Sequence, residues 1–223
     1  MTFVFCNEAG ESNLHVKGEL FKYLIKVRRH NIGDEVCLRT ENETSVLYIY
    51  MIKDIRGREA ILELKSSSTR LVKAHKNLHV IWCLIDPKSI EKVLPTLNEI
   101  GVAKISFVKC ERSQNNFGLD FERFRRILIN SMQQCGRSEF MEFEYIESLE
   151  EVLQRYKSVV YFDFCDNVLD ESDTIDTFLV GCEGGFSSNE RILLQNQKAF
   201  RLKTPMILRS ESAVCTVSSK ILF

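Results

Sequence analysis

The sequence predicts an α/β protein in two parts, a small β-rich unit followed by a larger domain with a parallel sheet. Short candidate strands lie close together in the first 70 residues, with turn signals between them. From residue 78 onward, apolar strand-like runs alternate with segments of helical periodicity. A length of 223 residues accommodates one large domain or two small ones, so this division is plausible.

The first unit is expected to form a small barrel, because its strands are short and closely spaced. Turn signals occur at residues 31–34 and 56–58, and a short helix is expected over Leu20–Val27. The polar stretch Ser66–Thr69 is expected to follow the last strand and to begin a linker over residues 66–77. The predicted strands are Glu35–Arg39, Ser45–Ile52 and Glu59–Leu64.

The second part reads as alternating strands and helices, which favours a parallel α/β sheet. Gly101 ends the first helix, and Pro95 is expected to bend it. The segment Asp163–Asp176 carries six acidic residues and is expected to be an exposed loop. The predicted strands are Leu78–Ile85, Ile105–Val108, Val159–Phe164 and Phe178–Val180, and the helices are Ile90–Ile100, Phe121–Met132 and Leu149–Tyr156.

Composition favours a cytoplasmic globular protein. Hydrophobic residues make up 44% of the chain, yet no apolar run is long enough to span a membrane, and no secretory signal pattern opens it. The net charge is −1, but residues 1–77 hold 13 Lys and Arg against 10 Asp and Glu, whereas residues 78–223 hold 17 against 21. The basic first unit permits phosphate contacts, although a solvated surface explains it equally well.

The eight cysteines predict neither a zinc site nor a disulfide framework. None forms a C-x-x-C pair, and Cys83 and Cys110 lie in apolar runs where a free cysteine behaves as a small hydrophobe. A reducing compartment is therefore expected. The histidines are not spaced as metal ligands, so no metal is expected, and all four are expected at the surface: His15, His30, His75 and His79.

A glycine-rich loop follows the last predicted strand. The apolar run 177–180 leads into Gly181, Gly184 and Gly185, and Ser187 and Glu190 then have the spacing of a helix capping box. Glycine occurs where a backbone turns with positive φ or approaches a ligand closely. The order of strand, glycine loop and helix start indicates a cofactor cradle, although a tight turn explains it about as well. The spacing matches neither the dinucleotide nor the P-loop motif.

Four segments resemble, in order, the motifs of one known family. Residues 98–113 are similar to "ELGV..I…ERS" and residues 133–137 to "EQ.gR". Residues 181–190 are similar to "GPEGGFS..E" and residues 207–213 to "ILR.ETA". On these motifs the chain resembles the RsmE family, the 16S ribosomal RNA uridine-N3 methyltransferases of the SPOUT class.

The resemblance implies a SPOUT-type domain with a C-terminal trefoil knot over residues 71–223, preceded by a PUA-like β-barrel over residues 1–70 that helps to hold RNA. It implies S-adenosylmethionine (SAM) as the cofactor, bound between the glycine loop and the last two knot loops. It further implies a homodimer, with each site near the partner subunit, and N3-methyluridine in the 16S ribosomal RNA of the 30S subunit as the product. No membrane or metal partner is implied.

The chain departs from the family pattern at several positions. Cys182 stands where the family has proline, Thr204 where it has glycine and Met206 where arginine is common. Thr96 occupies a position that is often lysine, and Ser212 replaces threonine. These departures leave open a noncatalytic RNA-binding or ribosome-assembly factor on a degenerate SPOUT scaffold.

The resemblance also selects residues for the cofactor. Gly181, Gly184 and Gly185 are expected to let the backbone close on it, and apolar neighbours are expected to line its adenine and methionine parts. For Leu179, a place in the core is equally plausible. The other residues expected at the cofactor are Val180, Glu183, Met206, Ile207 and Leu208.

Attack by uridine N3 becomes easier as its proton leaves and negative charge spreads to O2 and O4, so a fixed arginine would stabilise the reaction. Arg209 and Arg137 are predicted to act in this way, and Arg112 is a further candidate. Arginine also suits phosphate, so any of these side chains could hold RNA instead. Glu211 and Glu183 are candidate proton acceptors, although solvent could serve; for Arg209 and Glu211 the alternative is a structural ion pair.

Basic clusters mark the predicted RNA contacts, although such clusters are more often solvated faces. One lies beside Tyr23 and another on the predicted helix 121–132, where it includes Arg125. Cys182 could in principle be a nucleophile, but no histidine or second cysteine lies near it in sequence, so a filler role is favoured. The residues predicted to bind RNA are Lys22, Lys26, Arg28, Arg29, Arg112, Arg123 and Arg126.

Overall fold

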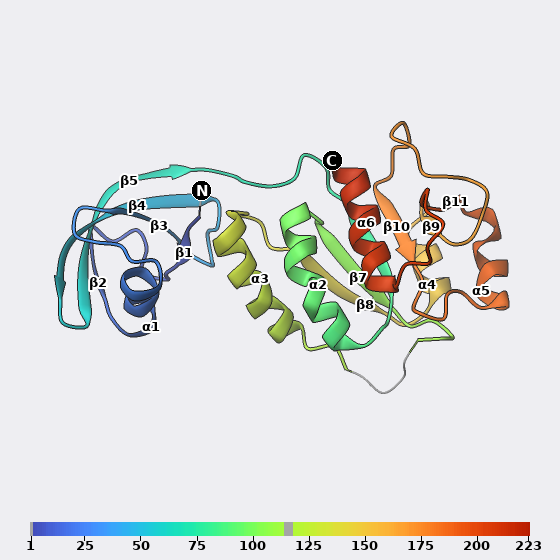
Figure 1. The fold of residues 1–223 in the computed structure, drawn as a ribbon, viewed down its shortest axis with the longest axis horizontal. Coiled ribbons are helices and arrows are strands. Elements are labelled where there is room, and N and C mark those ends of the chain that lie inside the picture. The colour runs from blue at the N-terminus through green and yellow to red at the C-terminus, as the bar shows by residue number, and fades with distance from the viewer. Residues whose placement is uncertain (1, 114–117) are drawn as a thin grey trace. The chain divides into compact units, whose positions relative to one another are not determined.

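The computed structural model describes residues 2–113 and 118–223 and divides the chain into two compact units (Figure 1). The first unit comprises residues 1–73 together with residues 132–139. The second comprises residues 74–131 and 140–223. None of the helices in the described part of the chain has the length and apolar character that crossing a bilayer requires.

The first unit is built on a five-stranded sheet in the order β1-β3-β4-β5-β2. Strand β1 pairs parallel with β3, and the other pairings are antiparallel. Inward-facing side chains such as Leu38, Tyr50 and Leu62 are fully buried and form its core. Its elements are β1 (Val4–Phe5), β2 (Asn13–Val16), α1 (Gly18–Phe21), the π-helix η1 (Lys22–Val27), β3 (Glu35–Arg39), β4 (Val46–Arg56) and β5 (Glu59–Thr69).

The polar stretch Ser66–Thr69 belongs to β5 and is not a linker, so that expectation is wrong. Val46 pairs with Thr69 and Leu47 with Ser68 in the antiparallel ladder between β4 and β5. Ladder hydrogen bonds join backbone groups, and exposed serine side chains do not interrupt them. A polar composition therefore does not end a strand by itself.

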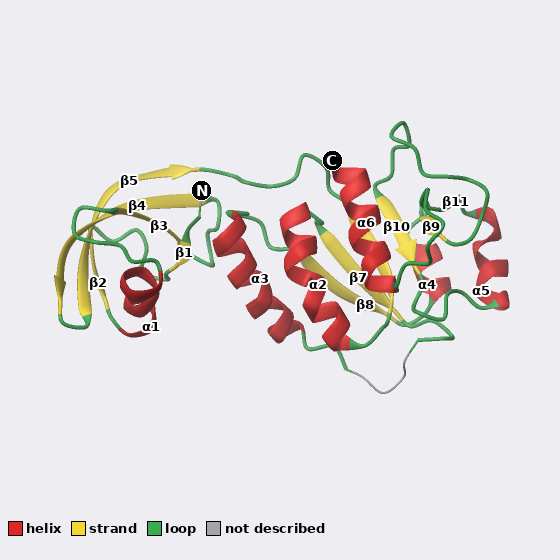
Figure 2. Ribbon diagram, viewed as in Figure 1, coloured by secondary structure: helices red, strands yellow, loops and turns green. Residues whose placement is uncertain are grey.

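The second unit contains a six-stranded sheet in which every pairing is parallel, in the order β11-β9-β10-β6-β7-β8 (Figure 2). The predicted parallel α/β arrangement is confirmed. Its strands are β6 (His79–Cys83), β7 (Lys104–Val108), β8 (Glu142–Ile146), β9 (Val160–Phe162), β10 (Thr177–Val180) and β11 (Ala199–Phe200). Its helices are α2 (Pro87–Ile100), α3 (Phe121–Cys135), α4 (Leu149–Arg155), α5 (Ser188–Leu193), the 3₁₀-helix η2 (Leu194–Asn196) and α6 (Ser210–Leu222).

Helix α2 shows how local sequence sets these boundaries. The Asp86 carboxylate accepts a hydrogen bond from the Ser89 backbone N–H at 3.1 Å and caps the helix start. Gly101 ends the helix with φ of +109°, a left-handed conformation that favours glycine. Helix α6 lies beside α2 and packs on β6 and β10 (Figure 1), which brings the last helix of the chain to the middle of the sheet.

The sequence did not reveal β8 and β11, because both are edge strands. An edge strand is half exposed, and its alternating or very short pattern gives little periodic signal. The acidic segment 163–176 is a loop, as expected, but it is not fully exposed. Leu169 and Ile175 are only 3% and 2% exposed, and Val168 bridges to Arg201 beyond β11. Two apolar side chains therefore anchor a loop in which four of the six acidic residues, Asp166, Asp170, Glu171 and Asp176, are exposed.

Candidate functional site

The glycine loop, Gly181–Phe186, leaves the carboxyl end of β10 and leads into α5. Gly185 has φ of +64°, and its N–H closes a turn to the Cys182 carbonyl at 2.9 Å. A Cβ on Gly181 would lie 3.3 Å from the Gly185 Cα, so the two sides of the loop approach too closely for a side chain. The loop therefore exposes backbone groups at the carboxyl end of the sheet.

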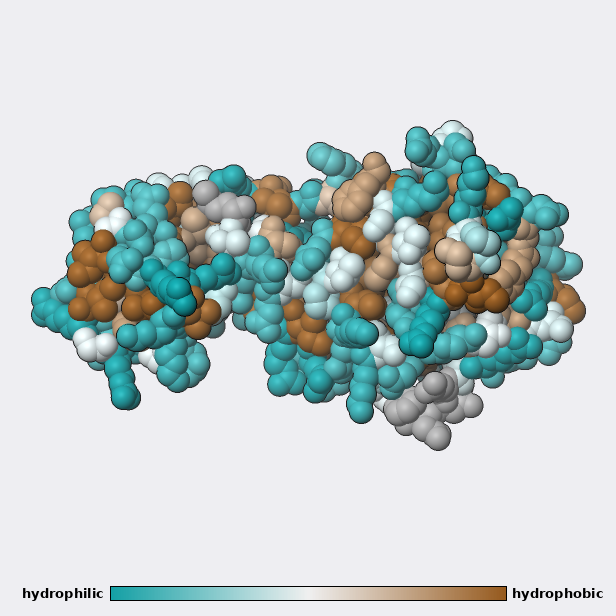
Figure 3. Space-filling model, viewed as in Figure 1, coloured by the Kyte–Doolittle hydropathy of each residue, from teal (hydrophilic) through white to brown (hydrophobic). Residues whose placement is uncertain are grey.

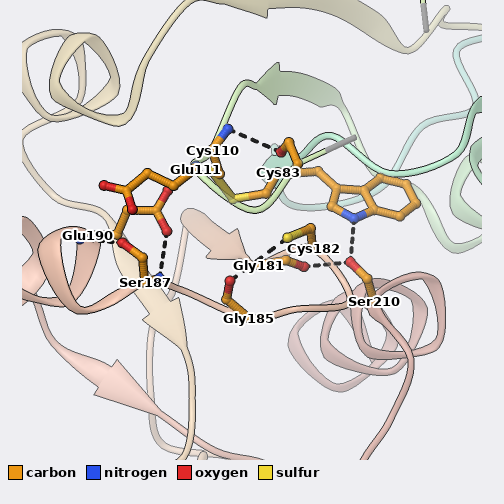
Figure 4. The surroundings of a disulfide bond; sticks show 11 residues. Cys83, Cys110, Glu111, Gly181, Cys182, Gly185, Ser187, Glu190 and Ser210 are labelled. Carbon is orange, nitrogen blue, oxygen red and sulfur yellow. Dashed lines mark hydrogen bonds between the residues drawn. A yellow bond between two sulfur atoms is a disulfide. The ribbon is translucent and has the colours of Figure 1, made fainter. Parts of the chain in front are cut away.

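The predicted capping box closes the loop at the start of α5. The Ser187 hydroxyl accepts from the Glu190 N–H at 3.1 Å, and the Glu190 carboxylate accepts from the Ser187 N–H at 2.7 Å. Both residues are buried. The other carboxylate oxygen of Glu190 accepts from the Glu111 N–H at 2.8 Å, so this one side chain holds two separate loops (Figure 4).

Cys83 and Cys110 form a disulfide beside the glycine loop (Figure 4). The expectation that these two are free thiols is therefore wrong. Cys83 ends β6 and Cys110 follows β7, and these parallel neighbours bring the two Cα atoms within 5.7 Å. That separation suits a disulfide, whereas a distance of 27 positions along the chain gives no hint of it.

The loop after β7 also contacts the glycine loop through Arg112. The guanidinium donates from Nη1 to the Gly184 carbonyl at 2.6 Å. A Cβ on Gly184 would lie 3.2 Å from the Arg112 Cδ, so glycine at this position leaves room for the arginine stem. Arg112 is thus held against the cradle while remaining exposed at its edge.

The segment 202–209 faces the glycine loop from the other side and leads into α6. It contains neither helix nor strand, and Met206 and Ile207 are 66% and 79% exposed. The Thr204 hydroxyl accepts from the Met206 N–H at 3.1 Å and shapes a turn. Figure 3 shows hydrophobic surface over the loops between α6, β9 and β11.

A cavity of about 620 Å³ lies between the glycine loop and the 202–209 segment. Phe162 at the end of β9 and Phe164 after it complete the rim, with Arg191 and Arg201. Its lining is mainly backbone and apolar side chains, which is the character of a small-molecule site. The predicted residues that line it are Arg112, Val180, Gly181, Glu183, Gly184, Gly185, Met206, Ile207, Leu208 and Arg209.

Comparison with known proteins identifies the family. Residues 72–222 match the family model of the RNA methyltransferase domain. The ribosomal RNA small subunit methyltransferase E of Helicobacter pylori strain 26695 is 36% identical, with 98% of each chain covered. This chain belongs to the RNA methyltransferase family. The ribosomal RNA small subunit methyltransferase E 2 of Borreliella burgdorferi is 24% identical over 92% of this chain and 89% of its own length.

Solved structures share the fold of this RNA methyltransferase. A ribosomal RNA small subunit methyltransferase E from Neisseria gonorrhoeae, solved with bound SAM, superposes with a TM-score of 0.73 at 18% identity, covering 98% of this chain and 96% of its own. A Porphyromonas gingivalis structure gives a TM-score of 0.78 at 18% identity and covers 100% and 98%. At these identities the likeness establishes the α/β fold.

Of the residues predicted for catalysis and cofactor binding, three do not line the cavity. Leu179 is fully buried in β10, which agrees with the alternative prediction that it belongs to the core. Glu211 is half-buried in the first turn of α6. Arg137 belongs to the first unit and is 5% exposed, and burial lowers the pKa of its guanidinium. Arg209, by contrast, is exposed at the start of α6 and makes no ion pair to any described residue.

The cysteine of the glycine loop is buried. Cys182 is 5% exposed, and burial raises the pKa of its thiol. A nucleophilic cysteine needs the opposite, an accessible and readily formed thiolate. These observations agree with a filler role for Cys182.

The predicted RNA-binding residues of the first unit lie on and just after η1, and all are exposed. Arg28 covers the Tyr23 ring at 5.2 Å and donates to its hydroxyl, whereas Lys22 pairs with Glu19 at 2.6 Å. Lys26 and Arg29 extend the same exposed surface. This arrangement combines positive charge with an aromatic ring.

The second basic cluster lies on α3 and is partly engaged within its own unit. Arg123 pairs with Glu91 at 2.6 Å, and Arg126 donates to the Glu122 carbonyl at 3.4 Å. Arg125 covers the Phe140 ring at 4.0 Å. The first cluster is thus the more available of the two for phosphate.

His79 is buried, so the prediction that it lies at the surface is wrong. It is 9% exposed at the start of β6, and its Nε2 lies 2.5 Å from the Ser106 hydroxyl. The pKa of its imidazole is lowered to about 4, mainly by burial and in addition by the nearby Lys104 ammonium. Parallel pairing of β6 with β7 and of β7 with β8 brings these groups together, which spacing in the sequence could not show.

Ser106 and its neighbours form a partly buried polar network near the amino ends of the strands. Ser106 donates to the Glu144 carboxylate, which also accepts from the Tyr156 hydroxyl at 2.6 Å and pairs with Lys104 at 2.9 Å. Burial raises the pKa of Glu144, but these three donors outweigh it and hold the pKa at about 2. In the described part of the chain, no three acidic, histidine or cysteine side chains gather as a metal site.

Proposed function

We propose that this protein transfers a methyl group from SAM to N3 of a uridine in 16S ribosomal RNA of the small ribosomal subunit. Membership of the RNA methyltransferase family establishes the type of reaction. The relatives' names specify ribosomal RNA of the small subunit, and the motif resemblance specifies uridine N3. A ribosomal substrate also favours the cytoplasm as its location. The observation that carries the proposal is the cavity between the glycine loop and the 202–209 segment.

The cavity fits SAM in size and chemistry. Its volume of about 620 Å³ lies within the range of small-molecule sites. Gly185 lines the cavity and a Cβ there would meet nothing within 4 Å, so its backbone is open to a ligand, and Met206, Ile207 and Leu208 offer an apolar side. Glu183 is exposed on the lining, where a carboxylate would favour a cationic ligand. When bound, SAM supplies a methyl group on a positively charged sulfur.

Arg209 is the residue best placed to assist the reaction. It lines the cavity, it is exposed, and it lies where the chain enters α6. A guanidinium directed at uracil O2 or O4 would stabilise the negative charge that develops as N3 loses its proton. Arg112 lines the same cavity and suits a phosphate or a base. Glu211 and Arg137 remain candidates, and Glu183 remains a candidate proton acceptor.

A trefoil knot at the chain end is part of the proposal. Strand β11 pairs with β9 at the sheet edge, and the chain then returns so that α6 packs on β6 and β10. On the way it pairs with the loop after β9, where the Leu169 N–H donates to the Arg201 carbonyl at 2.9 Å. It also meets the loop after β10, where Ser210 donates to the Gly181 carbonyl at 2.6 Å. These contacts of the chain end with two earlier loops support a knotted arrangement.

The first unit is proposed to be a PUA-like barrel that holds RNA. Its curved five-stranded sheet and the exposed basic residues of η1 support this role. Lys22, Lys26, Arg28 and Arg29 would contact phosphates, and Tyr23 beneath Arg28 would offer a stacking surface. The α3 residues Arg123 and Arg126 are proposed as weaker contacts.

A homodimer is proposed, with each site near the partner subunit. Met206 and Ile207 are large apolar residues left exposed at the cavity, and Phe164 beside them is 77% exposed. Exposed apolar groups that gather at one place favour a protein or ligand contact. Light scattering at micromolar concentration tests the dimer, and a monomeric protein that binds SAM at full strength would reject it.

Methyl transfer from labelled SAM to 30S subunits and to naked 16S ribosomal RNA tests the proposed function. Mass mapping of the modified nucleoside should then identify N3-methyluridine at one position. Calorimetry with SAM alone provides an independent measurement. Folded protein that neither binds SAM nor modifies either substrate would support the noncatalytic scaffold instead.

A further inference from the structure

Ser210 is the first residue of α6 and forms a buried junction between three distant parts of the second unit. Its hydroxyl donates to the Gly181 carbonyl at 2.6 Å and accepts from the Trp82 indole N–H at 2.8 Å. Trp82 is fully buried in β6, and Ser210 is only 5% exposed. Figure 4 shows Ser210 beside Gly181 at the entry to the glycine loop.

The hydroxyl is fully used in this junction. A serine hydroxyl has one hydrogen to donate, and the donation goes to Gly181. The indole N–H fixes where that hydrogen points, because it occupies a lone-pair side of the oxygen. Trp82 thereby orients the Ser210 hydroxyl toward the glycine loop. If the hydroxyl rotated, it would lose its hydrogen bond either to Trp82 or to Gly181.

The junction joins the two sides of the cavity. Gly181 begins the glycine loop, and Ser210 directly follows the 202–209 segment. Neither Gly181 nor Ser210 lies in a strand, and the Ser210 hydroxyl links the two directly. The position of Ser210 is also the one that the "ILR.ETA" pattern leaves unspecified, so the family motif did not point to it.

We infer that Ser210 is a positioning residue that sets the spacing between the glycine loop and the 202–209 segment and so determines the affinity for SAM. This inference rests on the proposed function. Without the hydroxyl, the Gly181 peptide is free to rotate and its carbonyl loses its partner. A pocket that must first be ordered binds its ligand more weakly than a preformed one.

A purely structural role predicts a different result, and Ser131 offers a matched comparison. The Ser131 hydroxyl accepts from Asn98 Nδ2 at 2.9 Å and donates to the Pro95 carbonyl at 3.3 Å. It is 4% exposed, lies in the same unit and does not line the cavity. Ser131→Ala therefore removes the same kind of buried hydroxyl away from the cofactor. Ser218 on α6 has a buried hydroxyl with no hydrogen-bond partner among the described residues, so Ser218→Ala controls for the helix itself.

Calorimetric titration with SAM tests the inference on the full chain. Ser210→Ala is expected to weaken SAM binding about tenfold, to raise KM for SAM equally, and to leave kcat at saturating SAM nearly unchanged. Ser210→Thr, which keeps the hydroxyl, should restore most of the affinity. Trp82→Phe should give an intermediate loss if the indole orients the hydroxyl, and it remains informative if Ser210→Ala does not fold.

The outcomes separate this inference from the proposed function. Equal losses of SAM affinity in Ser210→Ala and Ser131→Ala, or none in either, would overturn the positioning role. Unchanged affinity in both Ser210→Ala and Trp82→Phe would do the same. Absence of SAM binding by the unsubstituted protein would instead reject the proposed function, because no variant is involved in that measurement.

Discussion

The amino and carboxyl ends of the parallel sheet differ in how they are held together. Near the amino ends of β6, β7 and β8, the buried His79 and Ser106 and the half-buried Glu144 lie in one continuous hydrogen-bonded group. At the carboxyl ends of β6 and β10, a disulfide and two bonds to glycine carbonyls hold the loops, and a cavity remains open between them. Side chains fill the first end, whereas glycine and backbone shape the second.

This difference shows where the fold places rigidity and where it leaves space for a ligand. A buried charged network is stabilising only when every member is satisfied, so it tolerates little change. Loops held by a few hydrogen bonds at their ends can present backbone to a small molecule. The substitutions below test this contrast, beginning with the largest expected effect.

The disulfide should make the largest contribution to stability at the carboxyl end. Cys83 and Cys110 close a loop of 27 residues, which the chain-entropy estimate converts to about 3 to 4 kcal/mol in the free energy of unfolding. The double change to serine should lower the melting temperature by several degrees, and a dithiol should do the same to the unsubstituted protein. Cys165→Ser, a change at a free cysteine, is the control. Alkylation of eight thiols without reductant would contradict the bond.

Lowering the pH should destabilise the protein through the group at the amino ends of the strands. The imidazole pKa of His79 is about 4 in the folded protein against 6.5 ordinarily. Between pH 6.5 and 4 the imidazole is therefore protonated in the unfolded chain but neutral in the folded protein. The free energy of unfolding falls by up to about 3 kcal/mol as the pH drops through this range. His79→Gln should reduce the change of the denaturant unfolding midpoint with pH across this window. The exposed His75→Gln should not, and a parallel change in both variants would refute the assignment.

Arg209 tests the chemistry of the carboxyl end. Arg209→Ala should lower the rate of methyl transfer about 100-fold, as removal of a donor to developing negative charge does. The melting temperature should change little, because the side chain is exposed and makes no ion pair to the described residues. Lys203→Ala is a matched control, since this exposed cation lies nearby without lining the cavity. Normal turnover in Arg209→Ala would remove it from the mechanism.

Cys182 should have the smallest effect. The thiol is buried, and burial raises its pKa, so it is not prepared for nucleophilic attack. Cys182→Pro should leave the SAM dissociation constant within about twofold, or strengthen binding by restricting the loop in the unbound protein. Calorimetry and turnover are measured together. A variant that binds SAM normally yet transfers no methyl group would show that the thiol takes part in the reaction.

The sequence was sufficient wherever a local pattern carries the information. The helix that ends at Gly101 and the Ser187–Glu190 capping box were predicted from neighbouring residues, and the structure confirms both. The parallel α/β arrangement followed from the order of apolar runs. The motifs around residues 181–190 and 207–213 also identified the two segments that border the cavity.

Tertiary structure alone decided the contacts between segments that are distant in the chain. Strand pairing joined Cys83 to Cys110 and buried His79 against Ser106, and both outcomes contradicted expectations based on isolated residues. The return of α6 to the sheet placed Ser210 between Trp82 and Gly181. The physical reason is the same in each case: periodicity and capping act within one or two turns of chain, whereas burial and hydrogen-bond partners depend on which strand lies alongside.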